Sequence, residues 1–255
     1  MIRTLAIANH KGGSGKTTTA VNLSACLAQR GKRVLVIDLD AQASATSWLG
    51  CQAAEDGLID VFTGQRRLAA LVQPTGVAGL AIVPAGPRLQ GAERTLAGEI
   101  GVETVLRGEV RRLPPRQWEY VIVDCPPALG TLTLNALTAV REVLVPVEAH
   151  VMALSGLVQL RRTIELVQHR LNPELVLSGV LACRVDGRTR HAQEVLAELR
   201  QHFGGTVLRS VIRENVRLAE CPSFARPITL YAPASTGAAD YRALAEELIE
   251  QERRH

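Results

Sequence analysis

The sequence predicts an α/β fold, with a single doubly wound, mostly parallel β-sheet that carries helices on both faces. Short apolar runs without polar alternation, typical of strands buried on both faces, alternate along the chain with segments of helical periodicity. The 255 residues, of which 47% are hydrophobic and 21% charged, are enough for a large core. Because no Pro/Gly/Ser-rich linker interrupts the pattern, we expect one domain over residues 1–255.

The first elements show how each range is assigned. Residues 4–9 (TLAIAN) are a short apolar run that ends at a glycine-rich turn, which indicates a buried strand. A helix is expected over residues 16–30, because apolar residues recur there at helical spacing and Gly31 supplies the stop. The run RVLVI over residues 33–37 predicts the second strand.

The same alternation continues to the end of the chain. Further strands are expected over residues 80–83, 120–123, 142–147, 177–183 and 206–212. Further helices are expected in a stretch reaching about residue 112, over residues 154–171, through residue 203 and from residue 238. Because ligands of such sheets bind at the carboxyl ends of the strands, polar residues directly after strands are the candidate site residues.

A glycine-rich loop, KGGSGKTT, lies between the first strand and the first helix, the context that a phosphate-binding loop requires. Its glycines permit positive φ, so that successive backbone N–H groups can surround phosphate oxygens. Lys16 would contact the terminal phosphates and the Thr17 hydroxyl would ligate Mg²⁺. Only three of the 29 basic residues are lysines, and two of them lie in this loop, where a compact ammonium is needed. The expected nucleotide-binding residues are Lys11, Gly12, Gly13, Ser14, Gly15, Lys16, Thr17 and Thr18, with His10 at the position of the usual first glycine.

Acidic residues follow two of the buried strands. Asp38 and Asp40 come after the second strand, and Asp124 ends the run YVIVD. Carboxylates at these strand ends can hold Mg²⁺ or orient a water molecule beside bound phosphates. One of the paired aspartates can instead cap the following segment, and this alternative stays open, more so for Asp38 than for Asp40. Thr17, Asp38, Asp40 and Asp124 are the candidate metal ligands.

Other features of the chain exclude several classes of protein. No apolar run approaches the roughly 18 residues that span a bilayer, and the first residues lead into a strand rather than a signal peptide, so we expect a cytoplasmic protein. The five cysteines are widely separated, which argues against a zinc site and a disulfide framework. Cys125, directly after Asp124, has no evident base to activate it and is expected to be structural.

Five motifs together resemble the ParA/Soj family of chromosome and plasmid partitioning ATPases, within the deviant Walker A (MinD/ParA) superfamily of P-loop NTPases. They are KGGSGKTTTAVNLSACLA, VLVIDLDAQ, YVIVDCPPALG, SGLVQL and RPITLYAPASTGAADY, and the likeness covers about residues 1–250. The resemblance implies ATP and Mg²⁺ as cofactors, with Lys16 and Thr17 on phosphate and metal. It also implies that Asp40 positions the hydrolytic water and that Asp124 is the Walker B carboxylate.

The resemblance further implies an ATP-dependent homodimer of the nucleotide-sandwich type, in which Lys11 reaches the partner's phosphates. Such a dimer binds double-stranded DNA without sequence specificity and hydrolyses ATP faster when a ParB-type protein stimulates it, which implies a nucleoid-associated protein. Two departures from the family pattern stand out. Ala41 replaces the proline after Asp40, and Arg213-Glu214 replaces Pro-Arg before Asn215, the residue whose position implies contact with the nucleotide.

A basic strip lies late in the chain. Between Arg184 and Arg217 seven arginines accompany four acidic residues, which gives +3 of the chain's formal charge of +4. Base stacking on single strands uses aromatic side chains, and only 3% of the residues are aromatic. The strip is therefore better suited to phosphate contacts on duplex DNA. The alternative is a solvated arginine-rich face. With the family resemblance, Arg188, Arg190 and Arg217 are the expected DNA-binding residues.

Three other functions are alternatives for a chain with this fold. A membrane-cycling ATPase of the MinD type would end in a basic amphipathic helix with bulky apolar residues, whereas this chain ends in ALAEELIEQERRH. An iron–sulfur protein of the nitrogenase type would need a second cysteine near Cys125, and none follows nearby. A ParA-like ATPase that positions another cytoplasmic cargo on the nucleoid would have the same fold and chemistry, and stays open as an alternative.

Overall fold

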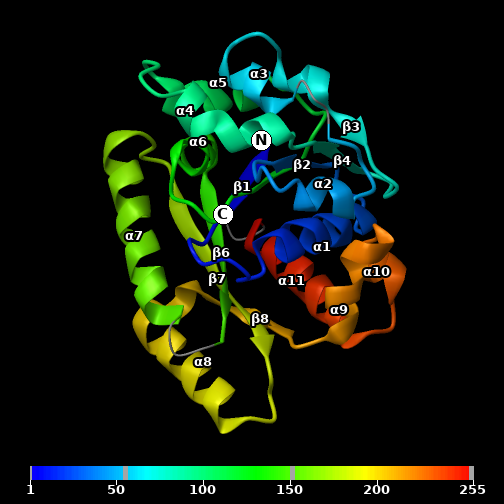
Figure 1. The fold of residues 1–255 in the computed structure, drawn as a ribbon. Helices are drawn as coiled ribbons and strands as arrows, with labels where there is room; N and C mark the ends of the chain where they lie inside the picture. Colours follow the sequence, from blue (N-terminus) through cyan, green and yellow to red (C-terminus); the bar gives the residue numbers. More distant parts are fainter. Residues whose placement is uncertain (1, 54–56, 150–152, 253–255) are drawn as a thin grey trace.

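The computed structural model describes residues 2–53, 57–149 and 153–252. Its strands are β1 (Arg3–Ile7), β2 (Val34–Asp38), β3 (Gln73–Pro74), β4 (Leu80–Val83), β5 (Tyr120–Asp124), β6 (Glu142–Glu148), β7 (Val176–Val185) and β8 (Val207–Arg213). Within the described residues they form one eight-stranded sheet in the order β3-β4-β2-β5-β1-β6-β7-β8 (Figure 1). All neighbours are parallel except β3 and β4, which are antiparallel. The predicted mostly parallel α/β fold is confirmed.

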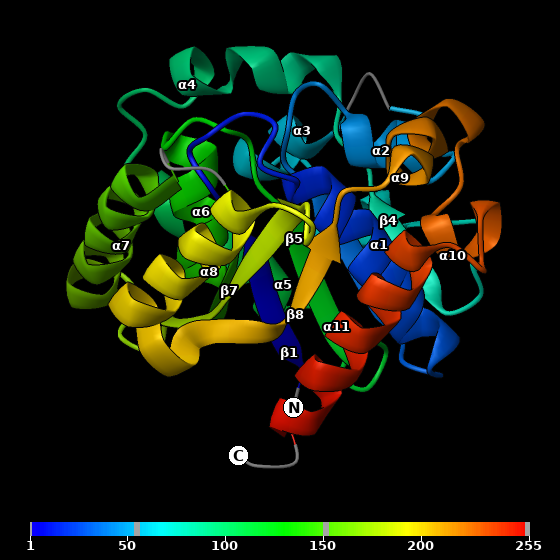
Figure 2. The same cartoon turned by 90° about the horizontal axis from the view of Figure 1, so that it is seen from below.

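Helices cover both faces of this sheet, as Figure 2 shows. They are α1 (Lys16–Gln29), α2 (Ser44–Trp48), α3 (Leu58–Phe62), α4 (Ala92–Thr95), α5 (Val105–Arg111), α6 (Thr131–Ala139), α7 (Ala153–Arg170), α8 (Arg190–Phe203), α9 (Val216–Glu220), α10 (Ile228–Tyr231) and α11 (Thr236–Glu252). Five short 3₁₀ turns connect them in the described ranges: η1 (Leu68–Leu71), η2 (Pro87–Gly91), η3 (Val102–Thr104), η4 (Gly204–Thr206) and η5 (Cys221–Phe224). Of the helices described, none is long and apolar enough to cross a membrane.

Two apolar cores lie on opposite faces of the sheet, because alternate strand residues point to opposite sides. On β1, Leu5 and Ile7 pack into the core that contains α1 and α11. Ala6 belongs to the other core, which contains α3 and α5 to α8. Each strand in the middle of the sheet is therefore buried on both sides, which explains its continuous apolar sequence.

Several stretches differ from the sequence-based expectation, which included neither strand β3 nor the short helices α2, α3, α9 and α10. The helical stretch expected to reach about residue 112 is broken into α4, η3 and α5, and Gly98 and Gly101 adopt positive φ between them. Helix α6, in contrast, was not predicted. Its sequence, TLTLNALTA, contains three β-branched threonines and has no capping side chain at Gly130, so local propensity favours a helix only weakly.

The fold brings the ends of several strands to one edge of the sheet. Asp38 and Asp124 are paired in register on the neighbouring strands β2 and β5. The loop between β1 and α1 lies at the same carboxyl edge, in the centre of the face turned toward the viewer in Figure 1. This edge is where ligands of doubly wound sheets bind.

Candidate nucleotide-binding site

The loop of residues 10–15 leads from β1 to the N-terminus of α1. Gly13 and Gly15 have φ of 74° and 92°, a region that favours glycine. A Cβ on Gly12 or Gly13 would meet no atom within 4 Å, whereas one on Gly15 would lie 3.6 Å from the Cys183 sulfur. Among the described residues no side-chain hydrogen bond caps α1 at Gly15. Its N–H groups and the helix dipole therefore suit a bound phosphate.

Lys16 and Asp124 are two of the buried ionisable groups at the centre of the site. The Lys16 ammonium donates a hydrogen bond to the Lys11 carbonyl at 3.0 Å. Burial lowers the pKa of Lys16, and the nearby Asp124 carboxylate opposes that shift. Asp124 is fully buried, and neither of its carboxylate oxygens has a hydrogen-bond partner among the described residues. Burial and the charge of Asp38 raise the pKa of Asp124 well above its usual value, against the opposing effects of Thr17 and Lys16.

Asp38 already has hydrogen-bond partners within the protein. One oxygen accepts from the Thr46 N–H at 2.9 Å and from the Thr46 hydroxyl at 2.7 Å, and the other accepts from the Asp40 N–H at 3.1 Å. Burial raises the pKa of Asp38 to about 6, although these hydrogen bonds act to lower it. This arrangement caps the first turn of α2 and favours the capping role that the sequence left open for Asp38.

Asp40 lies beyond the end of β2 and is partly exposed. One of its carboxylate oxygens accepts a hydrogen bond from the Gln42 N–H at 3.0 Å. Its charge also acts on Lys16 and Asp124, which locates it beside the phosphate loop. The second carboxylate oxygen has no hydrogen bond within the described residues, so Asp40 is suited to orient a ligand or water molecule.

Lys11, the second lysine of the loop, is half exposed. Its ammonium lies 3.7 Å from a carboxylate oxygen of Glu148, at the end of β6. The other oxygen of Glu148 lies 3.4 Å from the Arg184 guanidinium. Exposed ion pairs of this length are weak. Lys11 is therefore available for a stronger anionic partner.

His10 stands where the usual first glycine of the loop would be. Its imidazole packs against α7, and a Cβ on Gly156 would lie 2.2 Å from the His10 Cε1 atom. The ring nitrogen Nδ1 is buried without a hydrogen-bond partner among the described residues. The bulky side chain is thus accommodated by a glycine in a neighbouring helix.

The residues at this edge fit a magnesium ion accompanied by phosphates. Asp124 offers two buried oxygens without a hydrogen-bond partner among the residues described, and the Thr17 hydroxyl is close enough to affect the pKa of Asp124. Mg²⁺ keeps several waters and takes few protein ligands. In the part of the chain that is described, no three His, Cys, Asp or Glu side chains converge in a metal-binding cluster. Asp38, committed to Thr46, fits a ligand role less well than Asp124 and Thr17.

The remaining predicted site residues lie farther along the chain. Asn215 caps α9, because its amide oxygen accepts from the Arg217 N–H at 2.9 Å and its amide nitrogen donates to Thr236 at 2.6 Å. Its contact with a nucleotide stays a prediction. Cys125 is buried, and burial raises the pKa of its thiol, which agrees with a structural role.

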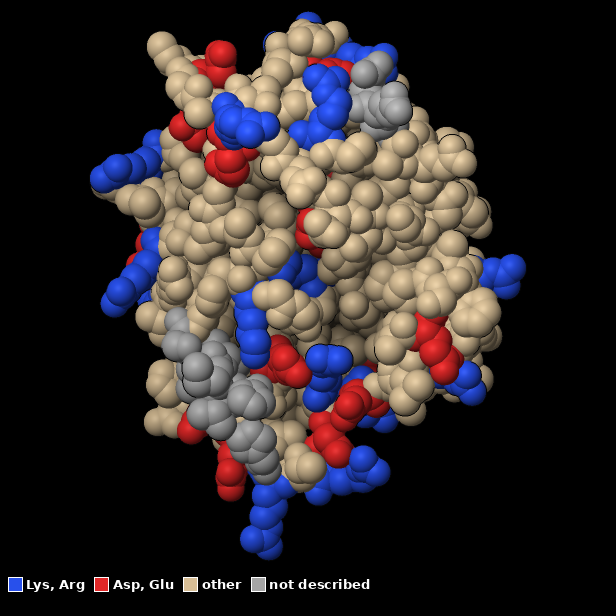
Figure 3. Space-filling model, in the orientation of Figure 1, with Lys and Arg blue, Asp and Glu red and all other residues tan. Residues whose placement is uncertain are grey.

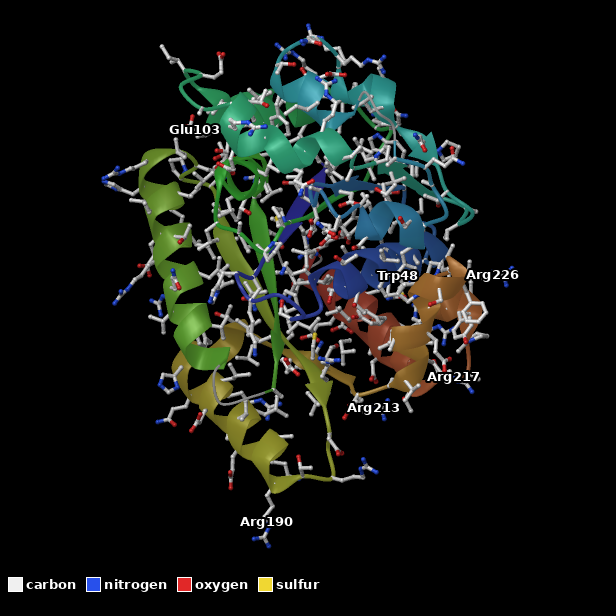
Figure 4. The ribbon with its side chains drawn as sticks, in the orientation of Figure 1. Trp48, Glu103, Arg190, Arg213, Arg217 and Arg226 are labelled. Carbon is white, nitrogen blue, oxygen red and sulfur yellow. The ribbon has the colours of Figure 1, made fainter. Side chains whose placement is uncertain are left out.

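The basic strip carries less free charge than the sequence count indicates. Arg188 forms two hydrogen bonds to Asp186, at 2.9 and 3.0 Å, and Arg217 lies 2.9 Å from Glu220. Three further arginines of the strip, Arg184, Arg209 and Arg213, are paired with acidic residues from other elements. Arg190 has no ion pair within the described residues. It projects from the start of α8, apart from Arg217 on α9 (Figure 4).

Sequence reasoning missed two residues at the site. Thr46 holds Asp38, and Glu148 pairs with Lys11. Glu148 ends a buried strand at the carboxyl edge, so the rule that selected Asp38 and Asp124 applies to it equally. Thr46 offered no such signal, because its role depends on how α2 folds back onto β2.

Comparison with known proteins shows which family has this site. A family model described as an AAA domain matches residues 2–177. The chromosome-partitioning ATPase Soj of Thermus thermophilus is 50% identical over 97% of this chain and 96% of its own length. The sporulation initiation inhibitor protein Soj of Bacillus subtilis is 44% identical, with 97% and 98% covered. The chromosome partitioning protein ParA of Myxococcus xanthus is 42% identical, with 98% and 89% covered.

Solved structures share the fold of this chain, and some of them contain a bound nucleotide and magnesium. Cobyrinic acid a,c-diamide synthase from Mycobacterium smegmatis, with bound ADP and magnesium, has a TM-score of 0.87 and 35% identity, with 99% of this chain and 96% of that chain covered. The septum site-determining protein MinD of Pyrococcus horikoshii, complexed with Mg-ADP, has a TM-score of 0.79 at 24% identity over 97% and 96%, and shows the fold alone. On its full-length likeness to Soj and ParA, and as its motifs indicated, the chain belongs to the ParA/Soj family of chromosome-partitioning ATPases.

Proposed function

We propose that this chain is an ATP-dependent DNA-partitioning protein. Its ATP-bound sandwich dimer binds DNA without sequence preference, and it hydrolyses ATP to ADP and phosphate on stimulation by a ParB-type partner, so that a chromosome or plasmid is segregated. The observation that carries the proposal is the phosphate loop beside the buried Asp124, whose carboxylate has no hydrogen-bond partner among the described residues, in a chain 50% identical to a partitioning ATPase. The synthase activity named for one structural relative is a property of that protein, which is only 35% identical.

The proposed chemistry assigns one task to each side chain. Lys16 neutralises the terminal phosphates of ATP, while Thr17 and Asp124 hold Mg²⁺, with Asp40 close by. Bound magnesium supplies further charge neutralisation for the phosphates. Asp40, whose second oxygen has no protein partner in the described residues, orients the attacking water. Such catalysis consists of positioning and electrostatic stabilisation, so a slow basal rate is expected without the partner.

Two features of the carboxyl edge support a dimer in which two such faces meet. Lys11 is half exposed, and within the described part of the chain its one ion pair is the 3.7 Å contact with Glu148, so it is available to a partner's phosphates. Figure 3 shows this face: charged side chains stand at its margin and in its central hollow, and a broad area to the right carries few charges. A face of this kind can be covered with little desolvation of charge. We propose one domain over residues 1–255.

Non-specific DNA binding by the dimer is proposed for the arginines of the late basic strip. Arg188, Arg190 and Arg217 are exposed, and phosphate contacts need no base-reading geometry. Dimer formation doubles the number of phosphates that the protein can neutralise, so affinity should rise steeply with ATP. We therefore propose that the protein is located in the cytoplasm and is associated with the nucleoid.

The alternative that the site permits is a ParA-like ATPase that positions another cargo on the nucleoid. A membrane cycle of the MinD type is less favoured, because the described part of α11 ends in acidic residues rather than in a basic amphipathic face.

ATP turnover with and without duplex DNA and a candidate ParB protein tests the proposal. We expect slow basal hydrolysis that rises when both are present, and no hydrolysis in Lys16→Ala. Turnover unaffected by DNA and ParB together would exclude partitioning with that partner. Turnover that persists in Lys16→Ala would exclude the phosphate-loop assignment.

A further inference from the structure

Glu93, on the short helix α4, caps the N-terminus of a different helix. One of its carboxylate oxygens accepts a hydrogen bond from the Thr131 N–H at 2.6 Å, and the other accepts from the Thr131 hydroxyl at 2.7 Å. Thr131 is the first residue of α6, and the preceding Gly130 has no side chain that can cap the helix. A carboxylate from 38 residues earlier in the chain therefore accepts a hydrogen bond from a free N–H group at the helix N-terminus. Its negative charge also lies at the positive end of the helix dipole.

The loop that precedes α6 follows directly after Asp124, the last residue of β5. Residues 125–130 connect the end of β5 to Thr131, and the loop is held at its start by the Cys125 N–H, which donates to the Ile7 carbonyl at 3.3 Å. Within the loop, the Ala128 carbonyl accepts from the Thr133 hydroxyl at 2.6 Å. Its far end joins α6, whose first residue, Thr131, donates two hydrogen bonds to Glu93.

Gly130 provides a second, independent observation. A Cβ on this residue would lie 2.2 Å from a carboxylate oxygen of Glu93 and 2.9 Å from its carboxyl carbon. The φ of Gly130 is −102°, which any residue adopts, so the backbone does not require glycine here. A side chain at this position would instead displace the Glu93 carboxylate, which lies at the flexible end of an exposed side chain.

We propose that Glu93 is a positioning residue for ATP hydrolysis. It fixes the start of α6 and thereby the path of residues 125–130 as they leave Asp124. The inference rests on the proposed ATPase function, because the loop matters to catalysis only if Asp124 lies beside bound phosphates. Among the described residues, the Glu93 carboxylate accepts its hydrogen bonds from Thr131 and not from the phosphate loop or Asp124. Helix α4, which carries Glu93, packs against α6 (Figure 1).

Geometry at a phosphate-transfer site is sensitive to small displacements. A loop fixed at both ends keeps its residues in one arrangement, whereas a loop released at one end samples several. We expect loss of the cap to lower kcat by between about tenfold and about a hundredfold, the range that a displacement of up to 1 Å produces. Binding of ADP depends on residues 11–18 and Asp124, which are held by other contacts. The KM for ATP and the affinity for ADP should therefore stay unchanged.

Steady-state ATP hydrolysis and ADP binding should be measured for Glu93→Ala, Glu93→Gln and Gly130→Ala. Glu93→Ala and Gly130→Ala should both lower kcat without changing KM, because one removes the carboxylate and the other displaces it. Glu93→Gln should recover much of the rate, since its amide oxygen still accepts from Thr131. Glu99→Ala is the matched control, because Glu99 is an exposed carboxylate of the same segment with no side-chain partner in the described residues.

The double variant Glu93→Ala/Gly130→Ala distinguishes this role from general loss of structure. With Glu93 truncated, the added Cβ meets no carboxylate, so the second substitution should cost nothing further. Additive losses, or a wild-type kcat in Glu93→Ala, would overturn the inference. If circular dichroism shows that one alanine variant does not fold, the test uses Glu93→Gln and the control Glu99→Ala. The separate effects of these two variants on kcat and on KM then decide. A wild-type protein that does not hydrolyse ATP at all would instead overturn the proposed function, and the inference with it.

Discussion

Two of the proposed DNA-binding arginines are already paired with carboxylates, and phosphates must compete with those partners. Arg217 lies 2.9 Å from Glu220, which also accepts a hydrogen bond from the Tyr231 hydroxyl at 2.8 Å. These contacts raise the pKa of Arg217 and lower that of Glu220, the latter chiefly through Tyr231. Removing the negative charge of Glu220 should therefore free Arg217 for a phosphate and increase DNA affinity.

The size of the effect follows from counterion release. If Glu220→Gln frees one arginine in each protomer, an ATP dimer gains two phosphate contacts. The slope of log affinity against log salt should then steepen by about 1.8, since each phosphate contact contributes about 0.9. Between about 50 and about 200 mM salt, a slope change of that size makes the variant lose about tenfold more affinity than the wild type loses. At low salt the Glu220→Gln variant should bind DNA more tightly than the wild type does.

Fluorescence anisotropy of a labelled duplex of arbitrary sequence, titrated in ATP at several salt concentrations, measures this slope. Glu194→Gln is the matched control, because it removes an exposed carboxylate from the same strip that pairs with no arginine in the described residues. Arg217→Ala should flatten the slope, and adding Glu220→Gln to it should change nothing further. Equal slopes for Glu220→Gln and Glu194→Gln would refute the reasoning, because the gain would then reflect net charge alone.

Three more predictions follow from the site and the core. Lys16→Ala should abolish tight binding of ATP with Mg²⁺, measured by calorimetry, because it removes the buried charge that faces the phosphates, and retained affinity would contradict this. Asp40→Ala should accumulate as an ATP dimer without turnover, whereas Lys11→Ala should bind ATP as a monomer. Light scattering distinguishes dimer from monomer. The reverse pattern would assign dimerisation to Asp40 and hydrolysis to Lys11. Burial acts to raise the pKa of Glu247, but hydrogen bonds from Ser210 and the neighbouring backbone outweigh it and lower that pKa. Its contribution to stability is therefore present above the usual pKa of 4.5 and is lost as the pH falls through the lowered value. Glu247→Gln should lower the free energy of unfolding by about 1–2 kcal/mol at pH 7 and by less near pH 4, measured by urea unfolding, and an equal loss at both would contradict the assignment.

The sequence predicted the parts of the molecule whose determinants lie close together in the chain. The phosphate loop is contiguous, and its strand and helix are recognisable from apolar periodicity. The positions of Asp38 and Asp124 followed from the apolar runs before them, because parallel strands end at a common edge. The family assignment, confirmed by the relatives, rests on the same local motifs.

Contacts between distant segments were not predictable from local pattern. Helix α6 is capped from a different helix, so its own sequence carries no start signal. Likewise, the count of arginines in the basic strip gave no sign that Glu148, Asp240 and Glu247 lie beside three of them. Such pairings arise only when the sheet order brings separate segments together.

The in-register pairing of β2 and β5 limits how the chain can change in length. Strand side chains alternate between faces, so one inserted residue within β5 would turn Asp124 to the other side of the sheet. The same insertion near Ile100, which is fully exposed on a loop, would move no site residue. Doubling a loop's length costs only about 0.6 kcal/mol. Tags or reporter domains should therefore be accepted near Ile100, whereas insertions into β2 or β5 should abolish nucleotide binding.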